Sequence, residues 1–406
     1  MARLKLYNGC VITPTGLIRD GSVLVTGGII TEVSKGNIDA PGAMEINAHG
    51  NYISPGFIDL HVHGGSGHDF MDNTVEAFLR IAETHARHGT TAMLPTTLSS
   101  SRTRLLETLK TYNEAEPLNK AGSQFIGMHL EGPYFALNQA GAQDTRYIRN
   151  PDPLEYHEIL AAYPCIKRWS AAPELPGAIE FGKYVTSQGV LAAMAHTDAV
   201  YDEALAGFEN GYTLVTHLYS GMSGVTRRGA IRYAGVVETA YLIDDLDVEI
   251  IADGIHLPPP LLKLVCKIKG PERTALITDA MRAAGTDATG GVLGSLEDGL
   301  KVIIEDGVAK LPDRSAFAGS VATFDRLLRN MVKLAGVSLS EAVKMASATP
   351  ARIMGIADKK GAIAVGMDAD LVIFDRDINV QTTIVQGRVA YNNPKTPHER
   401  NANFLR

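Results

Sequence analysis

The segment SPGFIDLHVHGGSG, residues 54–67, decides how the rest of the chain can be arranged. An apolar run leads through Asp59 into His61 and His63, and glycines then end any regular structure, which predicts a short buried strand followed by a loop. Because strand side chains alternate between two faces, His61 and His63 point the same way, as two ligands of one metal ion must. The alternative is a pair of ordinary buried histidines, since a lone His-x-His motif is weak.

The composition is that of a globular protein with more than one small core. The chain has 406 residues, of which 45% are hydrophobic and 20% are charged, so we expect one large α/β domain with a smaller attachment, or two domains. A net charge of -7 provides neither a basic face for nucleic acid nor a polybasic membrane anchor. The N-terminus lacks a signal-peptide pattern, and no apolar run approaches the ~18 residues that span a bilayer. We therefore expect a cytoplasmic protein without nucleic-acid or membrane partners.

The three cysteines, Cys10, Cys165 and Cys266, are few and far apart in the sequence. This spacing argues against a disulfide framework and against a thiolate zinc site. We expect them to be reduced and mostly buried.

Both ends of the chain have the pattern of short β-strands separated by tight turns. They are rich in β-branched and apolar residues, and Asn-Gly, Asp-Gly and Gly-Gly pairs supply turn chemistry near the N-terminus. The candidate strands are residues 4–7, 22–26, 29–33, 362–365, 371–374, 383–386 and 389–391. We therefore expect one small β domain built from residues 1–53 together with residues 359–406.

The middle of the chain, residues 54–358, alternates apolar strands with amphipathic helices. Stretches such as 75–87 and 202–209 carry apolar residues at intervals of three and four, as helices that pack on a sheet do. The candidate strands are residues 56–61, 91–94, 125–130, 166–171, 191–195, 213–216, 248–252 and 275–278. Eight such strand and helix units predict a parallel (β/α)8 barrel, whose working face lies at the carboxyl ends of the strands.

Polar residues with metal-binding or acid/base chemistry follow six of these strands. They are His61 and His63, Glu131, His196, His217, His256 and Asp279, in chain order. Imidazole and carboxylate ligands without thiolate suit a divalent ion that is held for catalysis with one position open to water. We therefore favour a metallohydrolase over a barrel whose histidines are only structural.

Several motifs, taken in order, resemble the amidohydrolase superfamily. They are the His-x-His after PGFIDL, the HLEGP segment, two later histidines, the aspartate of the last strand and the C-terminal GAIAVGMDADLVIFD. The longer segments GMHLEGPY, AHTDA, THLYSGM, IIADGIH, LITDAMRAAG and FAGS are similar to the N-acetylglucosamine-6-phosphate deacetylases of that superfamily. The resemblance implies a hydrolase of a phosphorylated amino sugar that releases acetate, usually a homodimer, with a β-sandwich made from both chain ends.

The resemblance also implies a metal site for these residues. One ion would be held by Glu131, His196 and His217. His61 and His63 match the positions that help to build a second site, bridged by Glu131, in those members that retain both histidines. We therefore expect one or two divalent ions per subunit, with zinc as the first expectation and iron, manganese or cobalt as alternatives.

Asp279 is the catalytic residue that the resemblance implies. It would take the proton of the attacking water and return it to the departing amine, which leaves far more readily when protonated. The alternative role of this aspartate is to cap the start of a helix, which Asp often does.

The resemblance places phosphate contacts on His256 and on an arginine supplied by the neighbouring subunit. The segment TRRGAIRYAG replaces the usual Arg-Glu-Pro-Gly, so position favours Arg228, with Arg227 and Arg232 as alternatives. The other implied substrate contacts are Ala142, Ser220, Gly221, Phe317, Ala318 and Gly319. Gln143 stands where many members have histidine, and we expect this departure to affect contacts with the sugar.

Some alternatives stay open at this point. His129 shares a strand face with Glu131 and could approach the site or be a buried, hydrogen-bonded histidine; Arg282 could contact substrate or form an ion pair in a loop. Another amidohydrolase reaction, such as deacylation of an N-acyl amino acid or opening of a cyclic amide, is the second hypothesis. Such relatives often carry a carboxylated lysine, whereas Glu131 stands where a bridging group is needed here. A non-catalytic scaffold barrel is the third hypothesis, and the retained ligands argue against it.

Overall fold

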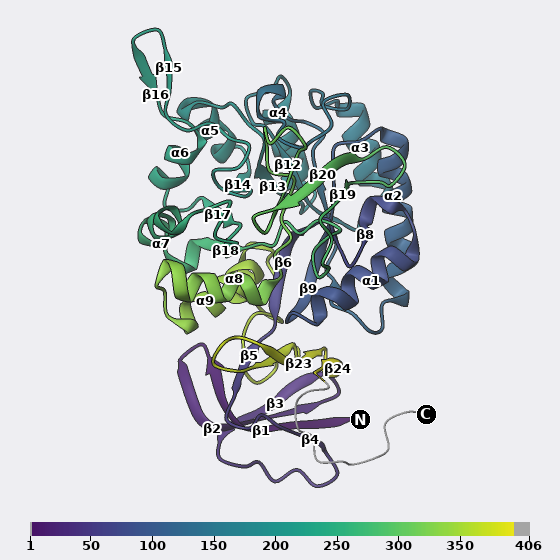
Figure 1. Ribbon diagram of the computed structural model, residues 1–406, viewed down its shortest axis with the longest axis vertical. Helices are drawn as coiled ribbons and strands as arrows, with labels where there is room; N and C mark the ends of the chain where they lie inside the picture. Colours follow the sequence, from purple (N-terminus) through teal and green to yellow (C-terminus); the bar gives the residue numbers. More distant parts are fainter. Residues whose placement is uncertain (1, 394–406) are drawn as a thin grey trace.

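The computed structural model describes residues 2–393, and eight parallel strands form its central barrel (Figure 1). The barrel strands are β6 (Phe57–Val62), β9 (Thr90–Thr97), β11 (Met128–Glu131), β12 (Ile166–Ala171), β13 (Leu191–Met194), β14 (Tyr212–Val215), β17 (Asp247–Ile250) and β18 (Thr274–Leu276). A short additional strand, β10 (Gln124–Phe125), pairs with β9 just before β11 begins. The eight predicted strands are confirmed, with their ends shifted by a few residues.

The barrel closes between β18 and β6 through contacts at the ends of these strands. The backbone N–H of Asp279 donates to the carbonyl of His61 at 2.9 Å. Beside it, the fully buried Asp59 carboxylate accepts hydrogen bonds from the Thr278 hydroxyl at 2.6 Å and from the Thr278 N–H at 3.2 Å. These contacts hold the first and last barrel strands together, which brings His61 and Asp279 side by side.

Helices surround the barrel on its outer side (Figure 1). They are α1 (Val75–Ala86), α2 (Arg102–Ala115), α3 (Pro153–Ala162), α4 (Ala178–Ser187), α5 (Tyr201–Glu209), α6 (Val236–Leu242), α7 (Pro259–Arg273), α8 (Phe324–Asn330), α9 (Leu339–Ala346) and α10 (Ala348–Ile353). The α1 helix shows why they form: the Thr74 hydroxyl caps its start by accepting from the Ala77 N–H, and Phe78 and Ile81 are buried on one face. Among residues 2–393, no helix combines the length and apolar character that a membrane crossing requires.

Short elements join these helices and strands. They are β7 (Gly64–Gly65), β8 (His68–Asp69), the 3-10 turns Phe70–Asp72, Glu116–Leu118 and Leu137–Gln139, and the π-helical turn Met331–Ala335. The π-helical turn follows α8 directly. Cys10, Cys165 and Cys266 form no disulfide, but all three are half-buried rather than mostly buried as expected.

The two chain ends form a separate β-rich domain beneath the barrel (Figure 1). Its strands are β1 (Arg3–Thr13), β2 (Gly16–Thr26), β3 (Ile29–Lys35), β4 (Met44–Asn47), β5 (Tyr52–Pro55), β22 (Leu371–Phe374), β23 (Val380–Val385) and β24 (Arg388–Asn392). The β5 strand pairs with β1 on one side and with β22 on the other, so it joins the N-terminal and C-terminal parts into one sheet. Leu6, Val23, Ile53 and Ile373 belong to a core of this domain that is distinct from the barrel core.

One predicted strand of this domain is absent, and the domain limits stay a proposal. Residues 362–365 are not a strand, because the chain turns there and the Gly366 N–H pairs with the Ile30 carbonyl while Ile363 is buried in the core. The limits 1–53 with 359–406 and 54–358 remain our proposal for the two domains, although β5 extends past residue 53. The end of the second segment, residues 394–406, lies outside the described residues.

Two small β elements near the barrel are not part of the predicted pattern. The hairpin of β15 (Thr226–Arg228) and β16 (Ile231–Tyr233) projects away from the barrel beyond α5 and α6 (Figure 1). The second element is a sheet between β18 and α8 that consists of β19 (Gly290–Leu293), β20 (Leu300–Glu305) and β21 (Val308–Lys310). This sheet contributes Leu293 to the wall of the cavity described below.

Candidate active site

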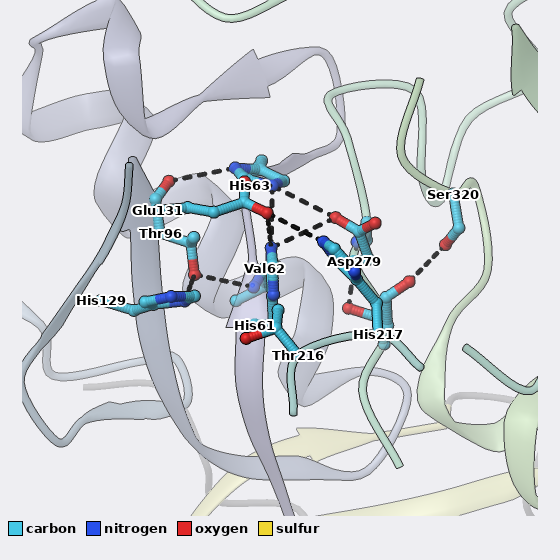
Figure 2. A network of polar contacts seen from close by, with 12 residues as sticks. His61, Val62, His63, Thr96, His129, Glu131, Thr216, His217, Asp279 and Ser320 are labelled. Atoms are coloured by element: carbon cyan, nitrogen blue, oxygen red, sulfur yellow. Dashed lines mark hydrogen bonds and ion pairs between the residues drawn. The ribbon is translucent and has the colours of Figure 1, made fainter. Parts of the chain in front are cut away.

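Six side chains from five strand ends meet at the carboxyl-terminal rim of the barrel. They are His61, His63, Glu131, His196, His217 and Asp279, and we call them the rim cluster. Figure 2 labels five of them, with their imidazole nitrogens and carboxylate oxygens pointing toward one another. All six are buried in the described chain. The structure therefore brings together every metal ligand and the catalytic residue expected from the sequence.

Glu131 is the meeting point of three imidazoles. Its Oε1 atom lies 3.0 Å from His217 Nε2, 3.2 Å from His196 Nε2 and 3.5 Å from His61 Nε2. Glu131, His196 and His217 are the expected ligands of the first ion, and His61 lies beside them. The Glu131, His61 and His217 ligand atoms are close enough to share one ion.

Asp279 is the centre of a second, overlapping group. Its Oδ1 atom lies 3.1 Å from His63 Nε2 and 3.4 Å from His61 Nε2, and the two imidazole nitrogens are 3.1 Å apart. His63 Nε2 is also 3.4 Å from Glu131 Oε2. The ligand atoms of His61, His63 and Asp279 could likewise hold one ion. Because His61 belongs to both groups, the rim cluster has donors for one or two ions.

The donor geometry fits a metal ion. Ligand atoms that lie ~2.0–2.2 Å from a tetrahedral ion are separated from one another by roughly 3.3–3.6 Å, close to the spacing of these side chains. The Nδ1–H of His196 donates to the Gln139 carbonyl at 2.8 Å, which orients Nε2 toward Glu131 Oε1. The second nitrogen of a metal-bound histidine commonly makes such a bond to a carbonyl. A cation bound here would replace the proton that otherwise joins His196 Nε2 to Glu131 Oε1.

Both carboxylates of the rim cluster are held in the ionised form. Burial raises the pKa of Glu131, but the nearby His61 charge and hydrogen bonds from His196 and His217 outweigh it and hold that pKa well below its usual range. Burial also raises the pKa of Asp279, and the charge of His61 with the hydrogen bond from His63 lowers it below its ordinary value. Two ionised carboxylates among four imidazoles are the donor set that a divalent cation requires.

Several site residues adopt backbone conformations that L-residues rarely take. The φ angles of His196, His217 and Asp279 are +46°, +32° and +47°, and that of Tyr219 is +80°. Such left-handed conformations cost of order 1–3 kcal/mol each and gather at functional sites. The strand ends are therefore bent so that these side chains turn into the barrel mouth.

Two glycines make room for this arrangement. A Cβ atom on Gly221, whose φ is +56°, would lie 2.7 Å from His196 Nδ1. A Cβ atom on Gly319, whose φ is +67°, would lie 2.9 Å from the carbonyl oxygen of Asp279. Gly221 and Gly319, both expected to contact substrate, thus occupy positions where any side chain would collide with the site.

A cavity of about 280 Å³ opens above the rim cluster, near the lower end of the roughly 300–1,000 Å³ typical of small-molecule sites. Its lining includes these residues expected from the sequence: His63, Glu131, Ala142, His196, His217, Ser220, Gly221, His256, Asp279, Phe317 and Gly319. Ala318 is buried behind the wall in an apolar cluster with Met281 and Leu293, although its two neighbours line the cavity. Tyr219, Leu98 and Leu293 also line it, and the sequence did not single them out.

His256 is held in a fixed orientation at the cavity wall. Its Nδ1 lies 2.8 Å from Asp253 Oδ2, and the backbone N–H groups of Ile255 and His256 donate to Asp253 Oδ1. Burial raises the pKa of Asp253, but these hydrogen bonds and the His256 charge bring it below its usual value. These contacts hold the imidazole at the wall of the cavity. The Phe317 ring packs against the imidazole with centroids 4.5 Å apart.

Arg228 does not reach this cavity within its own chain. It is exposed on the projecting hairpin, where its guanidinium lies 5.2 Å from the centre of the Tyr233 ring. Arg227 and Arg232 are exposed on the same hairpin. The structure of one chain therefore places all three candidate arginines outside the cavity.

His129 and Arg282, whose roles the sequence left undecided, both make structural contacts. His129 is buried, with its Nε2 2.7 Å from the Ser170 hydroxyl, and its ring centre lies 4.8 Å from that of His61. Arg282 forms a loop ion pair with Asp72 at 2.8 Å and donates to the carbonyls of Val292 and Gly294. Arg282 thereby ties the β19 strand to the loop after β6.

A second buried polar group lies below the rim cluster and is not indicated by any sequence motif. It consists of Arg168, Glu249, Thr216, Ser170 and His129, and we call it the floor cluster. The side chains of Arg168 and Glu249 are fully buried, and the guanidinium binds the carboxylate with two hydrogen bonds, one of 2.7 Å. Burial and the Arg168 charge lower the pKa of His129 well below its ordinary value, so this histidine stays neutral.

Comparisons with known proteins agree with the chemistry of this site. Residues 52–390 match the model of the Amidohydrolase family. The N-acetylglucosamine-6-phosphate deacetylase of Bacillus subtilis (strain 168) is 33% identical over 96% of this chain and 97% of its own length. The N-acetylgalactosamine-6-phosphate deacetylase of Escherichia coli O157:H7 is 33% identical over 80% of this chain and 84% of its length. A mutant N-acetyl-D-glucosamine-6-phosphate deacetylase from Mycobacterium smegmatis, solved in complex with N-acetyl-D-glucosamine-6-phosphate, superimposes with a TM-score of 0.88 at 30% identity, covering 97% of this chain and 100% of that chain.

Proposed function

The chain belongs to the amidohydrolase family, and we propose that it hydrolyses N-acetyl-D-glucosamine 6-phosphate to D-glucosamine 6-phosphate and acetate. The convergence of four imidazoles and two carboxylates on one cavity carries this proposal. Relatives whose names state this activity match the chain over most of its length. The proposed pathway role is the catabolism or recycling of amino sugars.

Metal binding falls to the rim cluster in this proposal. Glu131, His196 and His217 would hold the catalytic ion, and His61 and His63 would contribute to a second ion beside them. Zinc is our first candidate, with iron, manganese and cobalt as alternatives that the same nitrogen and oxygen donors accept. When bound, such an ion lowers the pKa of a coordinated water to about 7 and polarises a carbonyl group.

Asp279 performs the proton transfers. Its ionised carboxylate, held by His63 at 3.1 Å, takes the proton of the water that attacks the acetamide carbonyl. The same carboxyl group then gives the proton to the nitrogen of the sugar as the C–N bond breaks. Its backbone is bound on both sides, by the His61 carbonyl and by the Ser320 N–H, which keeps the carboxylate in place through both steps.

Within one chain, His256 is the residue that we propose binds the phosphate group of the substrate. Its Asp253 partner orients the ring. Backbone groups of Ser220, Gly221 and Gly319 line the same cavity and can donate to or accept from the sugar. Ala142 and Phe317 complete the proposed binding wall, and Ala318 supports it from behind.

We assign the remaining phosphate contact to Arg228 of a second copy of the chain. The exposed hairpin carries this arginine away from its own barrel, as a contact across a homodimer would need. Arg227 and Arg232 are the alternatives on the same hairpin.

N-acetyl-D-galactosamine 6-phosphate is a second candidate substrate. The relative named for that sugar is as similar, at 33% identity, as the Bacillus subtilis relative named for the glucosamine compound. The two sugars differ only in the configuration of one hydroxyl group, which a single hydrogen-bonding group in the cavity can discriminate.

The proposal is tested by measuring acetate release from both phosphorylated sugars and from unphosphorylated N-acetylglucosamine, with the metal content of the protein counted in parallel. We expect turnover of at least one phosphorylated sugar and a much lower kcat/KM without the phosphate. Equal rates with and without phosphate would remove the phosphate assignment. No release from a metal-loaded protein would overturn the deacetylase proposal.

A further inference from the structure

Gln143 makes a contact that the proposed function leaves unexplained. Its side-chain Nε2 lies 2.7 Å from Glu131 Oε2, the carboxylate oxygen that His196 and His217 do not approach. Its side-chain Oε1 accepts the backbone N–H of Ser99 at 2.8 Å. Gln143 thus connects the ligand at the end of β11 to the loop after β9.

The chemistry of the two partners fixes the orientation of the Gln143 amide. A backbone N–H can only donate and an ionised carboxylate can only accept, so the amide oxygen must face Ser99 and the nitrogen must face Glu131. One N–H and one lone pair of the amide oxygen take no part in these two bonds. Gln143 therefore uses half of its side-chain hydrogen-bonding capacity to hold Glu131 and Ser99.

The backbone that carries Gln143 is itself held. The Gln143 N–H pairs with the Ala140 carbonyl at 2.9 Å in a turn, and Gly141 has a φ of +56° within it. The residue is 5% exposed, so its bond to Glu131 is shielded from competing water. A buried hydrogen bond to a charged carboxylate is among the stronger kinds in proteins.

We propose that Gln143 is a positioning residue that holds Glu131 through Oε2 and so presents Oε1 to the metal together with His196 and His217. It supplies a donor without adding charge, so the carboxylate keeps its full charge for the cation. Groups that hold a metal ligand in this way typically change metal affinity or activity 10–100-fold when they are removed. This inference rests on the proposed metal site at Glu131, and it concerns metal binding before any sugar is present.

The test is titration of the metal-free protein with Co²⁺, read by the visible absorption spectrum of the bound ion, in the absence of sugar. Gln143→Met keeps the length of the side chain and removes both hydrogen bonds. Gln143→Glu keeps its shape and places a second negative charge against Glu131. Asn138→Ala is the control, because Asn138 is exposed in the same loop. Circular dichroism and the unfolding temperature of each metal-free variant check its fold.

We expect the Co²⁺ dissociation constant to rise 10–100-fold in Gln143→Met, with an altered absorption spectrum, and to change less than twofold in the control. With saturating metal, kcat should fall while the KM for the sugar phosphate changes little. A rise in KM with unchanged Co²⁺ affinity and spectrum would overturn the inference and make Gln143 a substrate contact only. If the wild-type protein binds no Co²⁺, the proposed function fails as well, so the two failures are distinguishable.

Discussion

The rim cluster and the floor cluster are both buried in the same barrel, yet their charges are balanced in different ways. In the floor cluster, the Arg168 guanidinium meets the Glu249 carboxylate directly and donates to the Thr216 hydroxyl at 2.8 Å, which leaves its Nε without a partner among residues 2–393. In the rim cluster, two carboxylates meet imidazoles and the uncharged Gln143 amide, and the second ring nitrogens of His61 and His217 have no hydrogen-bond partner among the same residues. The floor cluster balances its own charge, whereas the rim cluster is suited to an added cation.

The two clusters are almost equally buried, so this difference in charge balance indicates a structural role for the floor cluster and a functional role for the rim cluster. The buried Arg168–Glu249 pair balances its own charge and links strands β12 and β17 across the barrel. A buried group of donors that converge without a cation indicates a binding site. Four changes to the two clusters or to the bound metal test whether one role is structural and the other functional.

The first change is Asp279→Asn, which removes the proposed proton carrier from the rim cluster and preserves its shape. We expect turnover to fall by about 10³–10⁴-fold, equal to about 4–5.5 kcal/mol in the barrier, while the metal stays bound. Acetate release and metal content measured on the same sample check this. Activity within tenfold of wild type would remove Asp279 from the role of base.

The second change is Glu249→Gln in the floor cluster. It leaves the buried Arg168 charge without a charged partner, and breaking a buried pair in this way costs about 3–5 kcal/mol of unfolding free energy. The double variant Arg168→Met with Glu249→Met should regain most of this loss, because no lone charge remains. Denaturant unfolding of the metal-loaded proteins measures both. If the double variant also loses its metal, the two clusters are not independent.

The third change is removal of the metal by a chelator. With the free ion at about 100 times its dissociation constant, binding to the folded state adds about 2.7 kcal/mol of stability, and chelation should remove it. The loss should be equally large in the floor variant Glu249→Gln and absent in Glu131→Gln. Thermal unfolding with and without chelator provides the measurement. A chelator effect of equal size in Glu131→Gln would place the ion elsewhere.

The fourth and smallest change is Gly319→Ala. Alanine in the left-handed conformation costs about 1–2 kcal/mol, and its Cβ would lie 2.9 Å from the Asp279 carbonyl oxygen. We expect the free energy of unfolding to fall by this amount. We also expect kcat to fall, because the new Cβ shifts Asp279. Gly366→Ala serves as a control, since its φ of +91° is equally left-handed and its surroundings are open in the terminal domain. A fall in kcat of the same size in the control would show that strain alone is responsible.

The sequence allowed the barrel and the rim cluster to be predicted because each ligand stands at the end of an apolar strand. The strand ends of a parallel barrel all meet at one rim, so local motifs were enough to bring Glu131, His196 and Asp279 together. The floor cluster could not be predicted in this way. Arg168 and Glu249 are 81 positions apart and stand inside strands, where the sequence does not show that charged side chains face each other across the barrel.

The same limit applies to Gln143 and to the small sheet after β18. The sequence marked Gln143 as a departure from the family pattern, but its contact with Glu131 depends on the fold of the loop between them. The strands β19 and β21 are four and three residues long and are flanked by glycine and aspartate turns, so no periodic pattern identified them. Short elements packed against a barrel take their conformation from tertiary contacts, such as those of Arg282.

Stepwise return of Zn²⁺ to the chelated protein, with bound ions counted and acetate release from N-acetylglucosamine 6-phosphate measured, tests whether the rim cluster holds the catalytic metal. We expect no release without metal and full release at one or two ions per chain. We also expect that Glu131→Gln loses this binding whereas Glu249→Gln keeps it. Full release from the metal-free protein, or equal metal binding in Glu131→Gln, would contradict this assignment of the metal to the rim cluster.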